Sequence, residues 1–282
     1  MEPASVDLGN LSIAASVSGD PSWPALLLLH GWPHSRAVYD AVLDRLGERL
    51  FVVAVDLPDV GESIGAPLSA EKTVLAGVVL DAAGRLGAHK PVVCGFDVGG
   101  MIAFAAARDH GGRIAGAVVA NTVVPGIEPW SVIIADPRIW HFAFHAVPNL
   151  PETLVAGRER AYFDFFIDIL SKDSTRVPDA LREAFVRAYR RPEALKTGFD
   201  WYRALPEDAR TNSRHKRIDT PILYLRGDAD AAKIEDYVEG FRTAGAQDVS
   251  SQIIPDCGEF LPQEAPDAFV AEVLRFCAAN RV

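Results

Sequence analysis

The sequence predicts an α/β protein in which helices cover both faces of a mostly parallel sheet. Two observations lead to this prediction. Short apolar runs recur along the chain, and amphipathic segments of helical length separate them. In addition, a chain of 282 residues with 49% hydrophobic content can bury the core that such a sheet needs. One α/β domain with an insertion fits both the length and the pattern.

The predicted strands are continuous apolar runs, which is typical of strands buried on both faces. The opening segment, about residues 4–18, indicates instead an antiparallel hairpin. The apolar runs lie at 25–30, 51–56, 91–96, 114–121 and 221–228, and a further strand precedes Pro255. The amphipathic segments that we expect to be helices lie at 36–47, 71–87, 99–109, 231–243 and 265–278.

The alternation of strands and helices stops between residues 124 and 207. This segment is helical in pattern and holds 13 of the 25 aromatic residues of the chain. We interpret it as a helical cap inserted into a core made of residues 1–123 and 208–282. The aromatic rings then line the underside of the cap and face a cavity. The alternative is that they only pack the cap against the core.

Composition excludes several classes of function. A formal net charge of −10 and a pI near 5.2 disfavour nucleic acid and anionic membranes as partners. The three cysteines lack metal-binding spacing, so we expect buried, reduced thiols. Neither a leader segment nor a membrane span is evident, which favours a cytoplasmic protein. Metal-ligand clusters and a nucleotide-binding GxGxxG motif are absent, so we expect neither a metal nor a cofactor.

In an open parallel sheet, ligands bind beyond the carboxyl ends of the strands. The strand at 91–96 runs into "GFDVGG", which continues into a helix. Gly95 and Gly99 permit a sharp turn that presents Asp97, as in a nucleophile elbow with Asp in place of Ser. The N–H of Val98 at the helix start then points at an oxyanion site. The alternative for Asp97 is an ordinary helix N-cap.

A second motif follows the strand at 25–30. It is "HGWP", His30 to Pro33, and the backbone N–H of Trp32 can supply the second oxyanion donor. Each motif alone is a weak signal. Together, each directly after an apolar strand, they predict a carboxylate nucleophile beside two backbone donors.

With these motifs the chain resembles the α/β-hydrolase family, in particular its epoxide hydrolase and haloalkane dehalogenase branch. The "DLPDVGES" loop, the aromatic cap and the closing "PDCGEFLPQEAP" extend the resemblance over nearly the whole chain. It implies an eight-stranded sheet with an inserted cap, a small-molecule or peptide substrate and a possible homodimer. It also implies that Asp97 attacks carbon to form an ester, which a histidine-activated water hydrolyses.

The resemblance also identifies candidate residues in the cap. His141 in "WHFAF" and Tyr202 in "DWYRA" occupy the places of the two proton donors that polarise an epoxide oxygen. Both could instead be hydrogen-bonded core residues. Trp140, beside His141, and Phe96, beside Asp97, complete the candidate substrate-binding residues. Dehalogenation is disfavoured, because Val98 replaces the halide-binding Trp and no arginine lies between Val98 and Met101.

The pattern departs from the family in the closing turn. Glu259 stands where the catalytic His belongs, and none of the seven histidines follows residue 215. One usual place of the triad acid holds Asn121. The other offers Asp228 or Asp230, of which we favour Asp230. A Glu has an ordinary pKa near 4.3, so burial and two neighbouring carboxylates would have to raise the pKa of Glu259 by roughly two units.

Three hypotheses for function follow. The first is a non-hydrolytic proton transfer, such as an isomerisation or epimerisation of a bulky natural product or peptide, with Asp97, Glu259 and Asp230 as catalytic residues. The fold includes such a departure in the peptide epimerase of bottromycin biosynthesis, which is an analogy at the level of the fold. The second is an epoxide hydrolase in which Glu259 replaces His. The third is a catalytically silent protein that only binds a ligand.

Overall fold

The computed structural model describes residues 1–229 and 232–280. Its centre is an eight-stranded sheet in the order β1-β2-β4-β3-β5-β6-β7-β8. The strands are β1 (Glu2–Asp7), β2 (Ser12–Ser18), β3 (Ala25–Leu29), β4 (Phe51–Val55), β5 (Val92–Phe96), β6 (Gly116–Ala120), β7 (Ile222–Gly227) and β8 (Val249–Ile254). β1 and β2 pair antiparallel, β2 pairs antiparallel with β4, and the pairs from β4 to β8 are parallel. The predicted hairpin and mostly parallel sheet are confirmed.

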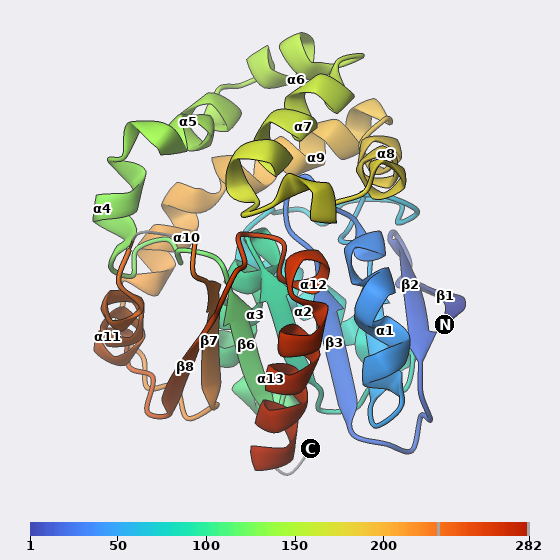
Figure 1. Ribbon diagram of the computed structural model, residues 1–282, viewed down its shortest axis with the longest axis vertical. Helices are drawn as coiled ribbons and strands as arrows, with labels where there is room; N and C mark the ends of the chain where they lie inside the picture. The colour runs from blue at the N-terminus through green and yellow to red at the C-terminus, as the bar shows by residue number, and fades with distance from the viewer. Residues whose placement is uncertain (230–231, 281–282) are drawn as a thin grey trace.

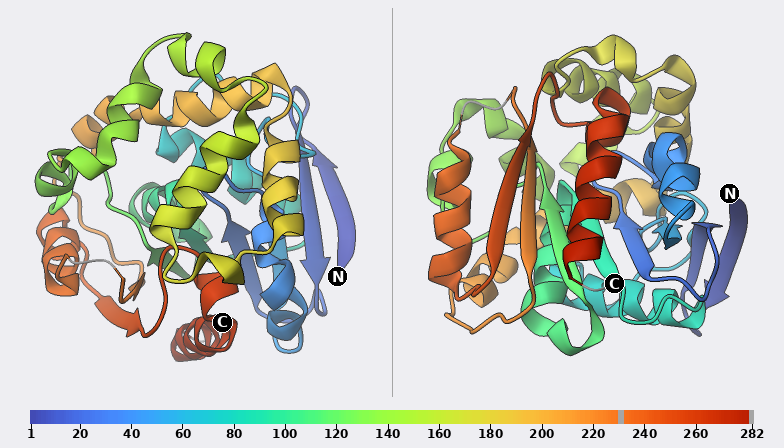
Figure 2. Two further views of the ribbon diagram at one scale, coloured as in Figure 1. Left: turned by 45° about the horizontal axis from the view of Figure 1, so that its top comes forward. Right: turned by 60° about the horizontal axis from the view of Figure 1, so that its bottom comes forward.

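Helices cover both faces of this sheet, as the right-hand view in Figure 2 shows. One face packs on α2 (Lys72–Arg85), α3 (Val98–Asp109) and α11 (Ile234–Ala244). The other packs on α1 (Asp40–Gly47) and α13 (Pro266–Ala279), which the short α12 (Leu261–Glu264) precedes. Two buried clusters result, because successive side chains of each central strand point to opposite faces. The 3-10 turns η1 (Arg36–Tyr39) and η2 (Gly111–Arg113) precede α1 and β6.

Between β6 and β7 the chain forms helices that lie over the carboxyl ends of the central strands (Figure 1). We call these helices and their connections the cap. They are α4 (Trp130–Ile134), α5 (Trp140–Ala146), α6 (Leu150–Val155), α7 (Glu159–Leu170), α8 (Asp179–Ala188), α9 (Pro192–Arg203) and α10 (Leu205–Asn212), with 3-10 turns η3 (Pro137–Ile139) and η4 (Ser174–Arg176). The helical pattern predicted for this part of the chain is confirmed.

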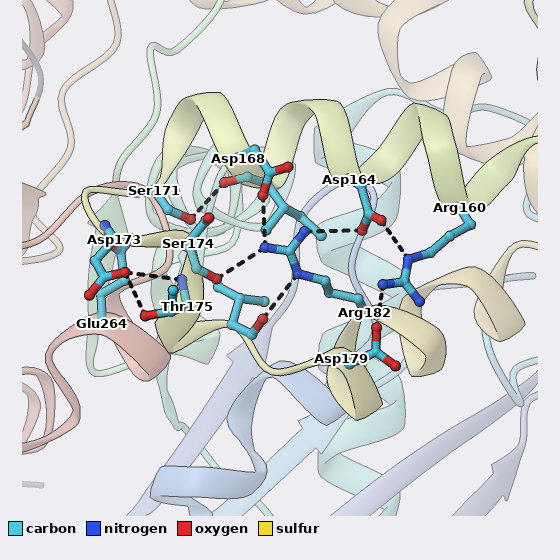
Figure 3. Close-up of polar contacts among 12 residues, drawn as sticks. Arg160, Asp164, Asp168, Ser171, Asp173, Ser174, Thr175, Asp179, Arg182 and Glu264 are labelled. Carbon is cyan, nitrogen blue, oxygen red and sulfur yellow. Dashed lines mark hydrogen bonds and ion pairs between the residues drawn. The ribbon is translucent and has the colours of Figure 1, made fainter.

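Arginine side chains hold the cap helices together. Arg182 of α8 donates to Asp164 and Asp168 of α7, at 3.2 and 2.8 Å, and to the carbonyl oxygen of Ser174, at 3.0 Å (Figure 3). Arg160 reaches Asp164 and, across to α8, Asp179. These bonds fix α7 and α8 as one unit above the sheet, because each arginine contacts two segments.

Two polar pairs, of which the Lys72–Asp208 pair is buried, dock the cap on the core. The Lys72 ammonium, 2% exposed, lies 2.8 Å from the Asp208 carboxylate and also donates to the carbonyl of Trp201. Arg191 donates to the Asp59 carboxylate at 3.2 Å and to the Ser63 carbonyl at 2.9 Å. Removing one partner of a buried ion pair is strongly destabilising. The position of the cap above the strand ends is therefore well determined.

The cysteines and the lengths of the helices were also considered in the sequence. Cys94, Cys257 and Cys277 are buried free thiols, as expected. In residues 1–229 and 232–280, every helix is too short or too polar to cross a membrane.

Candidate active site

Asp97 stands on a strained turn between β5 and α3. Its φ of 52° and ψ of −129° lie outside the regions that side chains favour, which costs on the order of 1–3 kcal/mol. Glycines make the turn possible. A Cβ at Gly99 would lie 2.2 Å from the Leu29 carbonyl oxygen, and one at Gly95 would lie 2.3 Å from the backbone of Gly99. The predicted elbow geometry is present at Asp97.

The two predicted oxyanion donors hold the Asp97 carboxylate itself. The N–H of Trp32 donates to Oδ1 at 2.6 Å, and the N–H of Val98 donates to the same carboxylate. Gly31 packs against the same carboxylate, because a Cβ atom on Gly31 would lie only 2.4 Å from Oδ1. Burial raises the pKa of Asp97 to about 6, although these two N–H groups and the Lys72 ammonium lower it. Asp97 is therefore mostly ionised at neutral pH.

His30 of the HGWP motif has a structural role. Its Nε2 accepts the N–H of Leu57 at 3.0 Å, so its Nδ1 carries the proton and donates to the carbonyl oxygen of Gly31 at 2.8 Å. Burial lowers the pKa of this imidazole. His30 thus fixes the turn that presents the Trp32 N–H to Asp97.

The aromatic side chains of the cap close over the Trp32 indole. Ring centres of Tyr162, Phe163, Phe166 and Tyr202 lie 5.2–6.0 Å from it, mostly edge to face. Trp32 is only 4% exposed. Two surface recesses of about 910 and 560 Å³ do not include Asp97 or Glu259 among their lining residues. The rings thus pack the cap on the core at Trp32.

Tyr202 of α9 interacts electrostatically with both candidate carboxylates, Asp97 and Glu259. Burial raises the pKa of its hydroxyl well above the usual value, and the charges of Asp97 and Glu259 raise it further. The hydroxyl therefore keeps its proton and is a hydrogen-bond donor at neutral pH. Asp97 and Glu259 both lie within electrostatic reach of this one group.

His141 and His145 follow each other by one turn of α5. The ring of His141 lies 6.1 Å from that of Tyr202, whereas His145 lies 4.5 Å from Tyr202 and 4.4 Å from Trp32. Burial lowers the pKa of both, to about 4 for His141, so both are neutral at pH 7. The Nε2 of His145 is 2.8 Å from the Tyr162 hydroxyl. The spacing of four residues was the signal that could have identified His145.

Tyr189, at the end of α8, is a second residue that the sequence did not identify. It is fully buried, and its hydroxyl lacks a hydrogen-bond partner within the described ranges. The charge of Asp97 contributes to the raised pKa of Tyr189, after burial. Gly198 of α9 brings Tyr189 and Trp32 together, since a Cβ at Gly198 would contact both rings.

Glu259 lies in a closing turn held from two sides. The Nδ2 of Asn121, directly after β6, donates to the carbonyl oxygens of Gly258 and Glu259 at 2.9 Å, and its Oδ1 accepts the N–H of Gly227. From the cap, the carbonyl of Leu170 accepts the N–H of Glu259 at 3.0 Å. Asn121 therefore acts as a clamp at the place where the family has an acid.

Glu264 fixes the other end of this turn. Its buried carboxylate accepts the N–H groups of Phe260, Lys172 and Asp173 at 3.0, 2.7 and 3.3 Å. Arg176 of η4 adds bonds to the carbonyl oxygens of Asp256 and Glu264. Glu264 and the 171–176 segment appear together in Figure 3. The closing turn is thus attached to the cap as firmly as to the sheet.

Two other candidates, Trp140 and Phe96, are not brought to the Asp97 carboxylate. Trp140 is 42% exposed and packs on Phe166, so the structure does not bring it to Asp97. The Phe96 side chain packs on the rings of His34 and Tyr39 in the buried cluster beside α1 and α13, so it is a core residue. Asp230 lies outside the described residues. Asp228 accepts the N–H groups of Asp256 and Cys257, which gives it a structural role in the turn.

Comparison with known proteins decides the family. The model of the alpha/beta hydrolase family matches residues 26–272. The chain belongs to the alpha/beta hydrolase family. Among its relatives is the soluble epoxide hydrolase of Corynebacterium sp. (strain C12), 27% identical over 267 residues that make up 91% of each chain. The pimeloyl-[acyl-carrier protein] methyl ester esterase of Nitrosospira multiformis is 25% identical and covers 95% of this chain and 99% of its own.

Solved structures agree with this assignment. Wild-type Cfl2 from Burkholderia cenocepacia superposes with a TM-score of 0.88 at 26% identity, over 97% of this chain and 95% of that one. In the described part of this chain, no cluster of three or more His, Cys, Asp or Glu side chains is arranged to hold a metal ion.

Proposed function

We propose that this alpha/beta hydrolase opens an epoxide by attack of Asp97 on carbon and then hydrolyses the resulting ester. The observation that supports this best is the position of the Asp97 carboxylate. Trp32 and Val98 hold one side of it, which orients the ionised group for attack as a nucleophile. The similarity to the Corynebacterium epoxide hydrolase supports the same substrate class.

Ring opening in this proposal needs a proton donor above Asp97. Tyr202 carries its proton at neutral pH and lies in the fields of both carboxylates, so it can protonate the epoxide oxygen. His145 and His141 are neutral and lie beside it. The Trp32 and Val98 N–H groups then stabilise the oxyanion that forms when water attacks the ester.

A second candidate function is a non-hydrolytic proton transfer. Two observations favour it: a carboxylate replaces the usual imidazole at Glu259, and the pKa of Asp97 is raised to about 6, which suits a general base. However, the relatives described above are named as an epoxide hydrolase and an esterase, which favours hydrolysis over epimerisation. A bulky or peptide substrate stays part of this second candidate only.

A single-turnover experiment in H₂¹⁸O tests the first proposal. Excess protein is mixed with styrene oxide, and both the diol and the peptide containing Asp97 are analysed by mass spectrometry. We expect unlabelled diol and one ¹⁸O atom in Asp97, because the diol oxygen comes from the carboxylate. Asp97→Asn is the matched control and should give neither product.

The other outcomes separate the alternatives. Label in the diol with none in Asp97 would mean that water attacks directly. Absence of diol and of an Asp97 adduct with a panel of epoxides would refute the proposal. If solvent deuterium then enters the α-carbon of a carbonyl substrate, the second candidate is supported. Binding without either reaction would indicate a silent ligand-binding protein.

A further inference from the structure

The hydrolytic half of the proposed reaction lacks an imidazole in the closing turn, and a different buried imidazole lies close by. His34 directly follows the HGWP motif and is 1% exposed. Neither of its ring nitrogens has a hydrogen-bond partner within residues 1–229 and 232–280. His30, four residues earlier and equally buried, has both nitrogens bonded. His34 is therefore not an ordinary satisfied core histidine.

The ring of His34 lies between the two segments that carry the candidate carboxylates. Its centre is 5.0 Å from that of Phe96 and 5.0 Å from that of Phe260. Phe96 immediately precedes Asp97, and Phe260 immediately follows Glu259. No other histidine has ring contacts with both segments within the described ranges.

The backbone also ties His34 to the nucleophile. Its N–H donates to the carbonyl oxygen of Gly31 at 3.1 Å, and Gly31 packs directly on the Asp97 carboxylate. The same short turn presents the Trp32 N–H to Asp97. One turn of four residues thus carries an oxyanion donor at one point and an unbonded imidazole at its end.

An imidazole in this condition is suited to accept a proton. Buried polar atoms normally have a partner, so two unbonded nitrogens indicate a site for water or for a reacting group. Burial lowers the pKa of His34 well below its usual value, so the ring is neutral at pH 7. A neutral imidazole has the lone pair that accepts a proton from water, whereas an imidazolium does not. The lowered pKa also makes the buried ring a weaker base, so the proposed proton transfer requires a neighbouring carboxylate to stabilise the imidazolium that forms.

We propose that His34 is the general base of ester hydrolysis and replaces the imidazole that the closing turn lacks. The inference rests on the proposed function, because it concerns the second half of that reaction. Water attacks Cγ of the Asp97 ester, and one of its protons passes to a ring nitrogen of His34. The oxyanion is held by Trp32 and Val98. The carbon–oxygen bond to Cγ then breaks, and the diol oxygen receives the proton from His34. The Asp97 carboxylic acid that remains gives up its proton, which restores the carboxylate and returns to Tyr202 the proton spent in ring opening.

Pre-steady-state kinetics with styrene oxide test this assignment. His34→Leu removes the imidazole and keeps an apolar side chain of similar volume. We expect ester formation within about threefold of the wild-type rate, and ester hydrolysis slowed by about a hundredfold or more. The ester on Asp97 should accumulate and be visible by intact mass. Phe185→Leu is the matched control, because Phe185 also packs on the His34 ring, at 5.1 Å, and carries no base.

Two further variants keep the inference falsifiable if His34→Leu does not fold. His34→Ala should be rescued by added imidazole, which can occupy the vacated space. The exchange variant, with His34→Glu and Glu259→His, should regain diol production relative to His34→Glu alone. His89→Leu, at an exposed position, controls for loss of a histidine.

The results separate two kinds of failure. If the wild type forms diol and folded His34→Leu or His34→Ala forms it at a rate within threefold, His34 only packs between the phenylalanines and the inference is wrong. If the wild type forms neither ester nor diol, the proposed function itself fails and the inference fails with it. Accumulated ester in the His34 variants, with normal turnover in Phe185→Leu, would support both.

Discussion

The elbow and the closing turn of this hydrolase both lie under the cap. They differ in how closely their side chains match the pattern that the sequence predicts. At the elbow, Asp97, its glycines and the Trp32 and Val98 donors form a complete nucleophile site. In the closing turn, Asn121 and Glu264 likewise hold the backbone, and the turn presents Glu259, a carboxylate, at the position where the sequence pattern predicts an imidazole. A turn can thus keep its position when its chemical group changes, because backbone bonds and not the group itself hold it.

The first prediction concerns Tyr202, the hydroxyl group on which the charges of both Asp97 and Glu259 act. Tyr202→Phe removes the proton donor and should lower the rate of ester formation by about a hundredfold or more. Because ring opening precedes hydrolysis, no ester should accumulate, which rapid-quench mass spectrometry can measure.

His141→Leu and His145→Leu show which histidine assists Tyr202. His145 lies closer to Tyr202, so its substitution should have the larger effect on ester formation. Equal effects from both would contradict the closer role of His145, and no effect from Tyr202→Phe would contradict the role of Tyr202 as the main donor.

The second prediction concerns stability at the elbow. The pKa of Asp97 is raised in the folded protein, to about 6, so ionising the group at neutral pH costs folding free energy. Asp97→Asn removes that charge. We expect it to increase the free energy of unfolding at pH 7 by up to about 3 kcal/mol while activity is lost. Urea denaturation at pH 7 measures the change.

Asp208→Asn is the matched control for this effect. Asp208 is also a buried carboxylate, but it is paired with Lys72 at 2.8 Å. The same substitution there leaves a buried ammonium without its counter-charge and should destabilise the protein by about 3 kcal/mol. Opposite signs for the two substitutions would show that Asp97 is held ionised for chemistry. Equal destabilisation would contradict this.

The third prediction tests the scaffold of the closing turn. Glu264→Gln weakens bonds that the charged carboxylate accepts from Phe260, Lys172 and Asp173. We expect a loss of about 2 kcal/mol in the free energy of unfolding. Ester hydrolysis should be affected more than ester formation, because Phe260, which Glu264 holds through its N–H, packs on the ring of His34. Glu272→Gln, which disturbs only a surface pair with Arg275, should change neither property.

The sequence predicted the elbow more completely than the closing turn for a physical reason. The elbow and HGWP motifs are short, and each directly follows an apolar strand, so they can be identified from neighbouring positions, although Gly99 and Trp32 act on segments distant in the chain. The parallel strands could be predicted equally well, because their continuous apolar runs reflect burial on both faces. These parts of the fold follow from short stretches of sequence.

The remaining site residues depend on contacts between distant segments. His34 packs on Phe260, 226 positions later in the chain, and its unbonded nitrogens are a property of that packing. The sequence pattern predicts a histidine late in the chain, whereas His34 lies near its start. Tyr189 and the clamp at Asn121 likewise emerge only when the cap and the sheet are assembled.

The last prediction uses pH to compare the elbow with the rest of the protein. Attack on carbon needs ionised Asp97, whose pKa is raised to about 6 by burial. The rate of ester formation should therefore be constant above about pH 7 and fall nearly tenfold per pH unit below about pH 5.

The free energy of unfolding responds to Asp97 in the opposite direction. A raised carboxyl pKa stabilises the folded state as pH falls from about 6 to the unfolded value near 4. Thermal unfolding measured between about pH 4 and pH 6 separates the effect on stability from the effect on rate. As the pH rises through this window, the wild type should lose more stability than Asp97→Asn, or gain less. A rate that stays constant down to pH 5 would mean that Asp97 is ionised more readily than its buried position implies.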